Sequence, residues 1–229
     1  MINDDDLPVS EGYAAWAPCY DDDGNPLTAL EGPALHSWFG PLEGRAALDL
    51  GCGTGRHSLA LAEGGAAVWA LDDSPEMIGR AMAKVRGFPV AWGRHRLPAP
   101  LPFADSTFDL VVLGLVAEHL EALGSVLGEA RRVTRPGGRL VLSALHPDRT
   151  AQGQRARFID PETGERRHIA TIHRTIPEYL TLARTAGWML VEERSLIVTA
   201  ALAGSLPRAL PYVDRPLGWA ACWTRPATS

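Results

Sequence analysis

The sequence predicts an α/β domain in which a mostly parallel sheet carries helices on both faces. Short apolar runs alternate with helix-forming segments between residues 46 and 144. The runs are nearly continuous in their apolar residues, which is typical of strands buried on both faces. At 229 residues the chain has the length of one large α/β domain, and no linker or internal repeat divides it, so we predict a single domain over 1–229.

The predicted elements begin with an N-terminal helical cap over 1–40. A cluster of Asp, Gly, Asn and Pro at 21–26 predicts a turn between two short helices of this cap. Residues 41–146 then alternate strands at 46–50, 66–71, 108–113 and 139–144 with helices at 58–63, 75–85 and 121–133. In the second of these helices Ser74 is the predicted N-cap and Pro75 the first helical residue.

The last part of the chain, 147–229, is predicted to form a different kind of structure. Apolar residues on both sides of a turn at 160–164 predict a hairpin over 157–172, and a helix follows at 176–186. Closing strands are expected at 189–198 and 219–224, with a proline-bearing loop at 204–218 between them. We expect this part to lie on the substrate side of the domain.

Composition excludes several classes of function. A net charge of −5 opposes long-range attraction of a polyanion, so nucleic acid is a poor partner. Three scattered cysteines suit neither a disulfide framework nor a zinc site, and the start of the chain has aspartates where a signal peptide has positive charge. With no apolar run of membrane-spanning length, we expect a cytoplasmic protein that binds no membrane.

A glycine-rich turn, Gly51-Cys52-Gly53-Thr54-Gly55, follows the first predicted strand. Such a turn lets the backbone approach a ligand closely, but the dinucleotide pattern needs its third glycine one residue later, where this chain has Arg56. Asp49 before the turn would repel a pyrophosphate and attract an ammonium or sulfonium group. Asp72 ends the next strand at the same sheet edge, where its carboxylate suits ribose hydroxyls.

Four segments together resemble a known family. LDLGCGTGRH, VWALDDSPEMI, LPFADSTFDLVVLGLVAEHL and RRVTRPGGRLVLS are similar, in order and spacing, to the motifs of class I S-adenosylmethionine-dependent methyltransferases of the UbiE-like, type 11 kind. The resemblance implies a Rossmann-like, seven-stranded sheet with the last strand antiparallel. It also implies S-adenosylmethionine as cofactor and S-adenosylhomocysteine as product.

The resemblance also implies site residues. Asp49, Gly51, Gly53 and Gly55 would meet the methionine part of the cofactor, Asp72 the ribose, and Ser74 with Met77 the adenine side. YAAWAPCYDDDGNPLTALE resembles the family's N-terminal lid, in which a tyrosine approaches the cofactor. The predicted cofactor-binding set therefore also contains residues of the lid and of later loops, namely Tyr13, Tyr20, Arg56, His57, Asp73, Arg96, Leu97 and Leu115.

One position departs from the family pattern. Many relatives have an acid shortly before LPF that accepts from the adenine amine, whereas this chain has Arg96 there. A guanidinium has no acceptor, so adenine recognition would fall to the backbone at Arg96 and Leu97 or to His95.

Candidates for catalysis are His119 and His146, which follow the strands at 108–113 and 139–144. Both are expected at the edge where the acceptor lies, and a histidine suits proton transfer at neutral pH. The alternative for each is a histidine that packs or hydrogen-bonds at a loop start. A base is needed only if the acceptor holds a proton, because methyl transfer otherwise depends on alignment and exclusion of water.

Arginines of the predicted hairpin region allow two interpretations. Arg157, Arg166, Arg167 and Arg174 could meet an anionic substrate or could be charges on an exposed strand face. No metal is predicted, because His146 and Asp148 alone make a weak ligand set.

The function predicted from the sequence is methyl transfer to a small molecule by a monomer or homodimer. Alternatives are a cofactor-binding enzyme with other chemistry and a catalytically silent partner subunit of the same fold.

Overall fold

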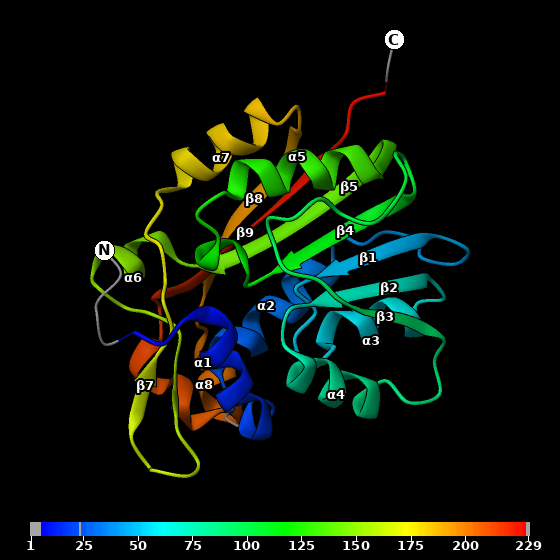
Figure 1. The fold of residues 1–229 in the computed structure, drawn as a ribbon. Coiled ribbons are helices and arrows are strands. Elements are labelled where there is room, and N and C mark those ends of the chain that lie inside the picture. The colour runs from blue at the N-terminus through cyan, green and yellow to red at the C-terminus, as the bar shows by residue number, and fades with distance from the viewer. Residues whose placement is uncertain (1–5, 23, 228–229) are drawn as a thin grey trace.

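The computed structural model describes residues 6–22 and 24–227, and its centre is a seven-stranded sheet (Figure 1). The strand order is β3-β2-β1-β4-β5-β9-β8. The strands in chain order are β1 (Ala46–Leu50), β2 (Ala67–Asp72), β3 (Val90–Arg94), β4 (Phe108–Gly114), β5 (Thr134–Leu145), β8 (Met189–Ile197) and β9 (Pro216–Thr224).

The sheet is parallel except for its last strand in the chain. β1 pairs in parallel with β2 and β4, and β9 runs antiparallel between β5 and β8. This arrangement confirms the predicted seven-stranded sheet. The strand order reverses between β1 and β4, which is the place where open α/β sheets bind ligands at the carboxyl ends of their strands.

Helices cover both faces of the sheet, as predicted. One core contains Leu123 and Leu127 of α5 (Leu123–Val133) and Tyr179 of α7 (Ile176–Thr185). The second core contains Leu35 of α2 (Pro26–His36) and Leu61 of α3 (Arg56–Glu63). In Figure 1, α5 lies across the near side of β4 and β5, whereas α3 lies behind β1 and β2.

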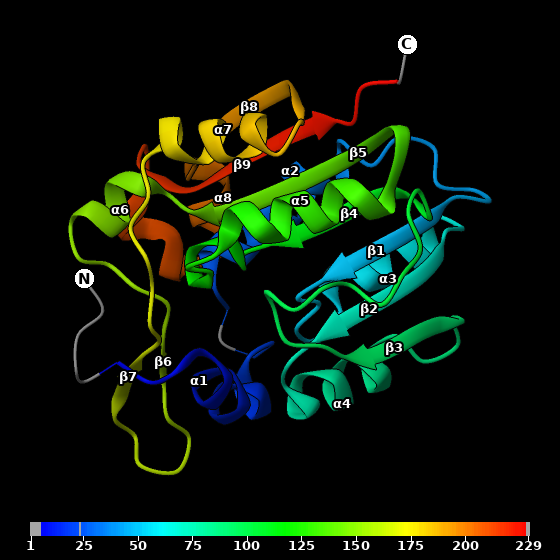
Figure 2. The same cartoon turned by 45° about the horizontal axis from the view of Figure 1, so that its top comes forward.

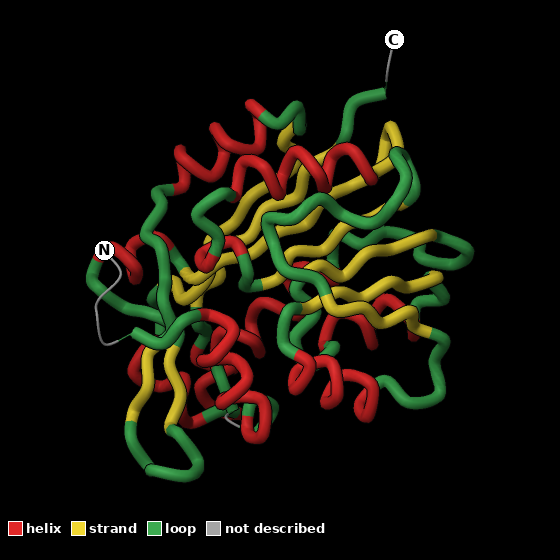
Figure 3. The backbone as a smooth tube through the Cα atoms, in the orientation of Figure 1, coloured by secondary structure: helices red, strands yellow, loops and turns green. Residues whose placement is uncertain are grey.

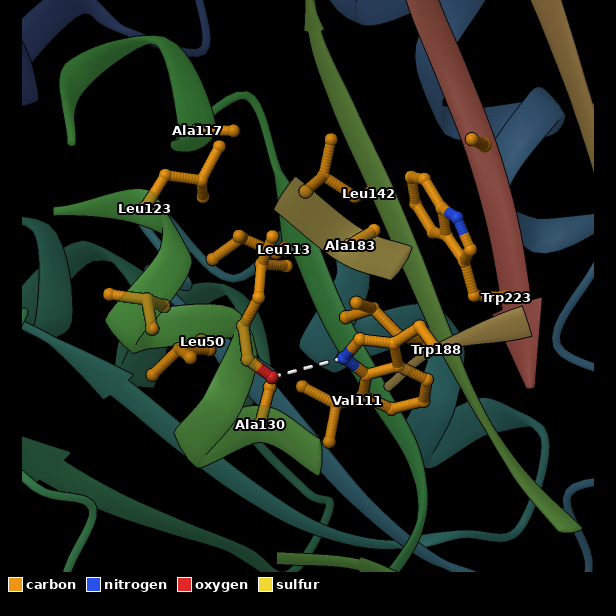
Figure 4. Close-up of a cluster of buried hydrophobic side chains, with 14 of the residues drawn as sticks. Leu50, Val111, Leu113, Ala117, Leu123, Ala130, Leu142, Ala183, Trp188 and Trp223 are labelled. Carbon is orange, nitrogen blue, oxygen red and sulfur yellow. Dashed lines mark hydrogen bonds between the residues drawn. The ribbon is translucent and has the colours of Figure 1, made fainter. Parts of the chain in front are cut away.

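Trp188 of the first core forms a hydrogen bond with helix α5. Its indole Nε1 donates to the carbonyl of Leu127 at 3.0 Å, and its ring packs among Val111, Ala130 and Ala183 (Figure 4). The indole is 3% exposed, so the hydrogen bond satisfies a donor that would otherwise be buried alone.

The first N-terminal helix and the hairpin lie side by side. The hairpin consists of β6 (Arg157–Ile159) and β7 (Arg166–His168), two separate strands in Figure 3, and it sits beside α1 (Val9–Trp16) in both cartoon views (Figure 2). Trp16 stacks on Phe158 with ring centroids 5.4 Å apart. Residues 1–5 and 23 of the predicted cap lie outside the described residues.

Three local predictions differ from the structure. β3 was not predicted, because its residues are all partly or fully exposed and its apolar pattern is short. The predicted loop at 204–218 instead contains the end of α8 (Ala200–Ser205), a 3-10 helix η3 (Pro207–Tyr212) and the start of β9. A short helix, α6 (Pro147–Ala151), follows β5 where no helix was predicted. α4 (Pro75–Lys84) has the predicted Ser74 cap.

In the described part of the chain, no helix combines the length and the apolar character that a membrane span requires.

Candidate functional site

The glycine turn between β1 and α3 has a left-handed backbone conformation that residues with a Cβ rarely adopt. Gly51, Gly53 and Gly55 all have positive φ angles, of 76°, 51° and 81°. A Cβ at Gly51 would lie 2.4 Å from Cγ2 of Val116, whereas a Cβ at Gly53 would meet nothing within 4 Å. The turn is therefore closely packed beneath Gly51 and open at Gly53.

Asp72 at the end of β2 holds the turn in place. Its Oδ2 accepts from the Gly53 amide at 2.8 Å and its Oδ1 from the Ser74 amide at 2.9 Å. Burial raises the pKa of Asp72, and the two amide hydrogen bonds oppose that rise. Each carboxylate oxygen has a second lone pair, so the group can still accept from a ligand hydroxyl.

A cavity of about 290 Å³ opens beside this turn, and we call it the turn cavity. It brings together most of the predicted site residues. Those that line it are Tyr13, Tyr20, Gly51, Gly53, Asp72, Asp73, Ser74, Met77, Arg96, Leu97, Leu115 and His119.

Four predicted cofactor residues do not line the turn cavity. Gly55 packs against α4. A Cβ added at Gly55 would lie 3.0 Å from the Cβ of Ala81. Arg56 and His57 bind Glu31, a fully buried acid of α2. Asp49 is also fully buried, and its Oδ2 accepts from Ser58 Oγ at 2.6 Å.

The acid near Arg96 is Asp73. Arg96 Nε donates to Asp73 Oδ2 at 2.8 Å, and both residues line the turn cavity. The arginine that departs from the family pattern thus pairs with the residue after Asp72, which also pairs with Arg94 at 3.5 Å. An acceptor carboxylate is therefore present at this end of the cavity, in a different sequence position.

His119 and Tyr13 form a hydrogen-bonded pair at the other end of the turn cavity. His119 Nδ1 lies 2.7 Å from the carbonyl oxygen of Ala170, which only accepts, so Nδ1 carries the proton. When the imidazole is neutral, Nε2 then accepts from the Tyr13 hydroxyl at 2.9 Å. Burial raises the pKa of Tyr13 well above its usual value, which keeps the phenol protonated as this donor.

A second cavity of about 250 Å³ adjoins the first, and we call it the arginine cavity. Tyr13, Tyr20 and Leu115 line both cavities, so the two meet at these side chains. The remaining walls come from α1, α2, the hairpin, α6 and η3, and they include Arg149, Arg155, Arg157, Arg166 and Arg208.

Glu118 lies in the arginine cavity and was not predicted from the sequence. It is 4% exposed, its Oε1 accepts from the Leu145 amide at 3.0 Å, and its Oε2 has no hydrogen-bond partner among the described residues. Burial raises the pKa of Glu118, although the neighbouring His119 opposes that rise. Its signal in the sequence is only its position beside His119 after the fourth sheet strand.

His146 lines neither cavity. Its Nδ1 accepts from the Asp148 amide at 3.2 Å as the N-cap of α6, and its Nε2 lies 3.0 Å from Ser195 Oγ of β8. Burial lowers the pKa of His146, with Arg149 adding to that effect and Asp148 opposing it. These contacts are those of the alternative expectation, a histidine that hydrogen-bonds at a loop start.

The hairpin arginines separate into two groups. Arg157 and Arg166 line the arginine cavity. Arg167 instead lies 3.7 Å from Asp160 and 3.6 Å from Glu165, and buried Arg174 donates to the carbonyls of Ala117, Leu120 and Glu121. Nor do the described residues bring three His, Cys, Asp or Glu side chains together as a metal ion would need.

The side chains that line the turn cavity suit a ligand with an adenosyl group and a sulfonium. Asp72 offers acceptors for ribose hydroxyls, and Met77 with Leu97 offers an apolar wall for a flat base. Tyr13 and Tyr20 present aromatic rings, which attract a cation, at the end shared with the second cavity. Asp49 Oδ1, a buried oxygen with no hydrogen-bond partner among the described residues, adds negative character behind the turn.

Comparison with known proteins agrees with this geometry. Residues 48–142 match the family model described as a methyltransferase domain. The chain is 36% identical over 113 residues to a demethylmenaquinone methyltransferase of Tropheryma whipplei, covering 48% of this chain and 46% of the relative. It is 32% identical over 137 residues to a malonyl-acyl-carrier-protein O-methyltransferase of Pectobacterium atrosepticum, covering 60% of this chain and 53% of the relative.

The chain thus matches about half the length of these relatives. A solved structure covers more: an S-adenosylmethionine-dependent methyltransferase from Mesorhizobium loti superposes with a TM-score of 0.73 and 26% identity, over 88% of this chain and all of that one. The motifs, the sheet order and these matches show that residues 48–142 form a methyltransferase domain, within a fold of the class I S-adenosylmethionine-dependent methyltransferases, whose cofactor is S-adenosylmethionine.

Proposed function

We propose that this chain transfers a methyl group from S-adenosylmethionine, held in the turn cavity, to a small molecule held in the arginine cavity. The observation that carries this proposal is that the two cavities share Tyr13, Tyr20 and Leu115. Ligands in the two cavities would therefore meet at these side chains. Alignment of this kind is the main contribution an enzyme makes to methyl transfer.

When bound, S-adenosylmethionine supplies a methyl group on a positively charged sulfur: the acceptor's lone pair forms the new bond to carbon as the carbon–sulfur bond breaks, and S-adenosylhomocysteine remains. Tyr13 and Tyr20 are positioned to orient the cationic centre with their rings. Tyr20 stays protonated, because burial raises its pKa to about 12. The stack of Trp16 on Phe158 closes one side of the arginine cavity against water.

We assign the proton-accepting role to Glu118 when the acceptor holds a proton. Its Oε2 is buried without a hydrogen-bond partner among the described residues, and its raised pKa makes this carboxylate a stronger base than an exposed one. His119 acts as a positioning residue in this scheme, since its Nε2 already accepts from Tyr13. His146 has the weaker case as a base, because both of its nitrogens contact protein groups outside the cavities.

A second function is favoured by one structural neighbour. A protein whose structure is described as a cyclase superposes with a TM-score of 0.69 at 16% identity, over 96% of this chain. The fold thus also occurs in a protein named for a different reaction, so S-adenosylmethionine binding with other chemistry is the alternative.

A labelled-cofactor experiment separates the two functions. The protein is incubated with S-adenosylmethionine carrying a deuterated methyl group and with a metabolite extract, and products are analysed by mass spectrometry. Methyl transfer predicts S-adenosylhomocysteine together with a metabolite that carries the label, and protein with Asp72→Ala serves as the control. Product formation without label and without S-adenosylhomocysteine would favour the alternative.

A further inference from the structure

Arg149 is a buried cation that lacks a carboxylate partner. It lies in α6, is 8% exposed, and lines the arginine cavity. Its Nε has no hydrogen-bond partner, and no carboxylate oxygen lies within 4.0 Å of its nitrogens among residues 6–22 and 24–227. Its guanidinium carbon lies 4.9 Å from the centroid of the Tyr212 ring. A buried charge without a counterion is costly, which points to a partner that the described residues do not supply.

The hairpin adds two more cations to the same cavity. Ile159 pairs with Arg166 and Phe158 with Arg167, so strand alternation sends Arg157, Ile159 and Arg166 to one face and Arg167 to the other. Arg157, Ile159 and Arg166 line the arginine cavity, as does Phe158 of the second face, whereas Arg167 does not line it. Arg157 Nη2 lies 3.5 Å from the Tyr212 hydroxyl, and no carboxylate of a described residue pairs with Arg157 or Arg166 within 4.0 Å.

The cations around Arg149 repel one another. Burial lowers the pKa of Arg149, Tyr212 opposes this effect, and Arg215 and Arg157 add to it. An anion bound between these guanidinium groups would relieve the repulsion and fill the vacant donors. Arginine is suited to this task because its planar fork binds carboxylate and phosphate groups through two parallel hydrogen bonds.

The cavity is polarised along its length. Some residues line only the arginine cavity, among them Arg149, Arg157 and Arg166. Others, such as Leu115 and Tyr13, line the turn cavity as well. Glu118 lines the arginine cavity, and the next residue, His119, lines the turn cavity and contacts Tyr13, which lines both. A ligand charged at one end would therefore have its uncharged end directed toward the cofactor.

We propose that the arginine cavity binds acceptors that carry a carboxylate or phosphate group, with Arg149 as the main anion-binding residue and Arg157 and Arg166 as its support. The reacting atom of such an acceptor is then a different group, near Leu115 and Glu118. That the bound anion is a methyl acceptor rests on the proposed function, whereas the anion site itself is independent of methyl transfer.

The test uses three probes with the same ring and different charge: benzoate, phenyl phosphate and neutral benzamide. Binding is measured by calorimetry in low-salt buffer on protein saturated with S-adenosylhomocysteine, so that the turn cavity is filled. We expect at least one of the two anions to bind at least tenfold more tightly than benzamide. Benzoate and phenyl phosphate are separate arms, and their ratio identifies the preferred anionic group.

Arg149→Met removes the charge but retains an apolar chain of similar length, and it should reduce the preference for anions to less than threefold. Arg167→Met is the matched control, since Arg167 does not line the arginine cavity and already pairs with Asp160 and Glu165. Arg157→Met, at the exposed rim of the cavity, should give a smaller loss and serves if Arg149→Met does not fold. Affinity for S-adenosylhomocysteine should stay unchanged in all three variants.

Equal binding of benzamide and both anions by the unaltered protein would overturn the proposal without any variant. An anion preference that survives in folded Arg149→Met would also overturn it. Failure of the proposed function gives a different result: S-adenosylhomocysteine would not bind, or no labelled product would form, while the anion preference and its dependence on Arg149 remained.

Discussion

Replacing Asp72 with alanine should weaken S-adenosylhomocysteine binding by ~1.5–3 kcal/mol, since this carboxylate is the proposed acceptor for the ribose hydroxyls. That range corresponds to a roughly 10- to 150-fold rise in Kd. Asp72 is well placed for this role because the amides of Gly53 and Ser74 hold both of its oxygens, at 2.8 and 2.9 Å. The carboxylate therefore loses little freedom when a ligand binds.

The same two hydrogen bonds predict a second effect of Asp72→Ala. Two backbone amides lose their acceptors, at about 0.5–1.5 kcal/mol for each hydrogen bond, so the free energy of unfolding should fall by about 1–3 kcal/mol. The loss of affinity and the loss of stability must therefore be measured separately. Urea unfolding gives the second quantity, and calorimetry at a temperature well below the unfolding transition gives the first.

Asp105→Ala is the matched control for this experiment. Asp105 is also an aspartate, but it lies on the loop before β4. Its side chain is 76% exposed and pairs with Arg132 of α5. We expect no change in Kd for that variant. Asp72→Ala protein that is folded yet binds S-adenosylhomocysteine within twofold of the unaltered protein would remove Asp72 from the cofactor site.

Three further predictions concern neighbouring groups. Glu118→Gln should reduce single-turnover methyl transfer to a protonated acceptor by ~10²- to 10⁴-fold and leave the S-adenosylhomocysteine Kd unchanged, and a loss below tenfold would argue against a base at this position. Tyr13→Phe should lower the free energy of unfolding by about 1 kcal/mol in urea titrations, because His119 Nε2 loses its donor, whereas an unchanged midpoint would contradict the hydrogen bond. Glu31 is buried, which opposes its ionisation, but His57, Arg56 and Ser143 lower its pKa from 4.5 to about 2. Its stabilising effect should thus be complete at neutral pH and be lost as pH falls from about 4.5 toward 2; we expect the stability difference between unaltered protein and Glu31→Gln to shrink over that window, and a constant difference would refute this linkage.

The cofactor half of the site could be predicted because its signals are local. The turn from Gly51 to Gly55 needs positive φ angles, and glycine is the residue that adopts them readily. Asp72 follows from topology alone, since neighbouring parallel strands end at the same edge of a sheet. Twelve predicted residues, counting His119 and Leu115, accordingly line the turn cavity.

Side-chain direction was harder to predict than chain position. His119 and His146 both follow sheet strands, but the ring of His119 faces a cavity while that of His146 caps α6 and reaches Ser195. Their sequence contexts contain nothing that separates the two. The same reason applies to Arg157 and Arg167, whose faces depend on the register of a three-residue hairpin pair.

The acceptor side of the site lies largely outside the region that the family shares. The methyltransferase match covers residues 48–142, whereas the arginine cavity is lined chiefly by residues 13–27 and 145–217. Of its lining residues only Leu115 and Glu118 fall within the match. Similarity over the shared region therefore supports the cofactor and says little about the acceptor. The choice of acceptor depends instead on segments attached to the edge of the sheet, where Arg149 supplies a charge that no carboxylate of the described chain neutralises.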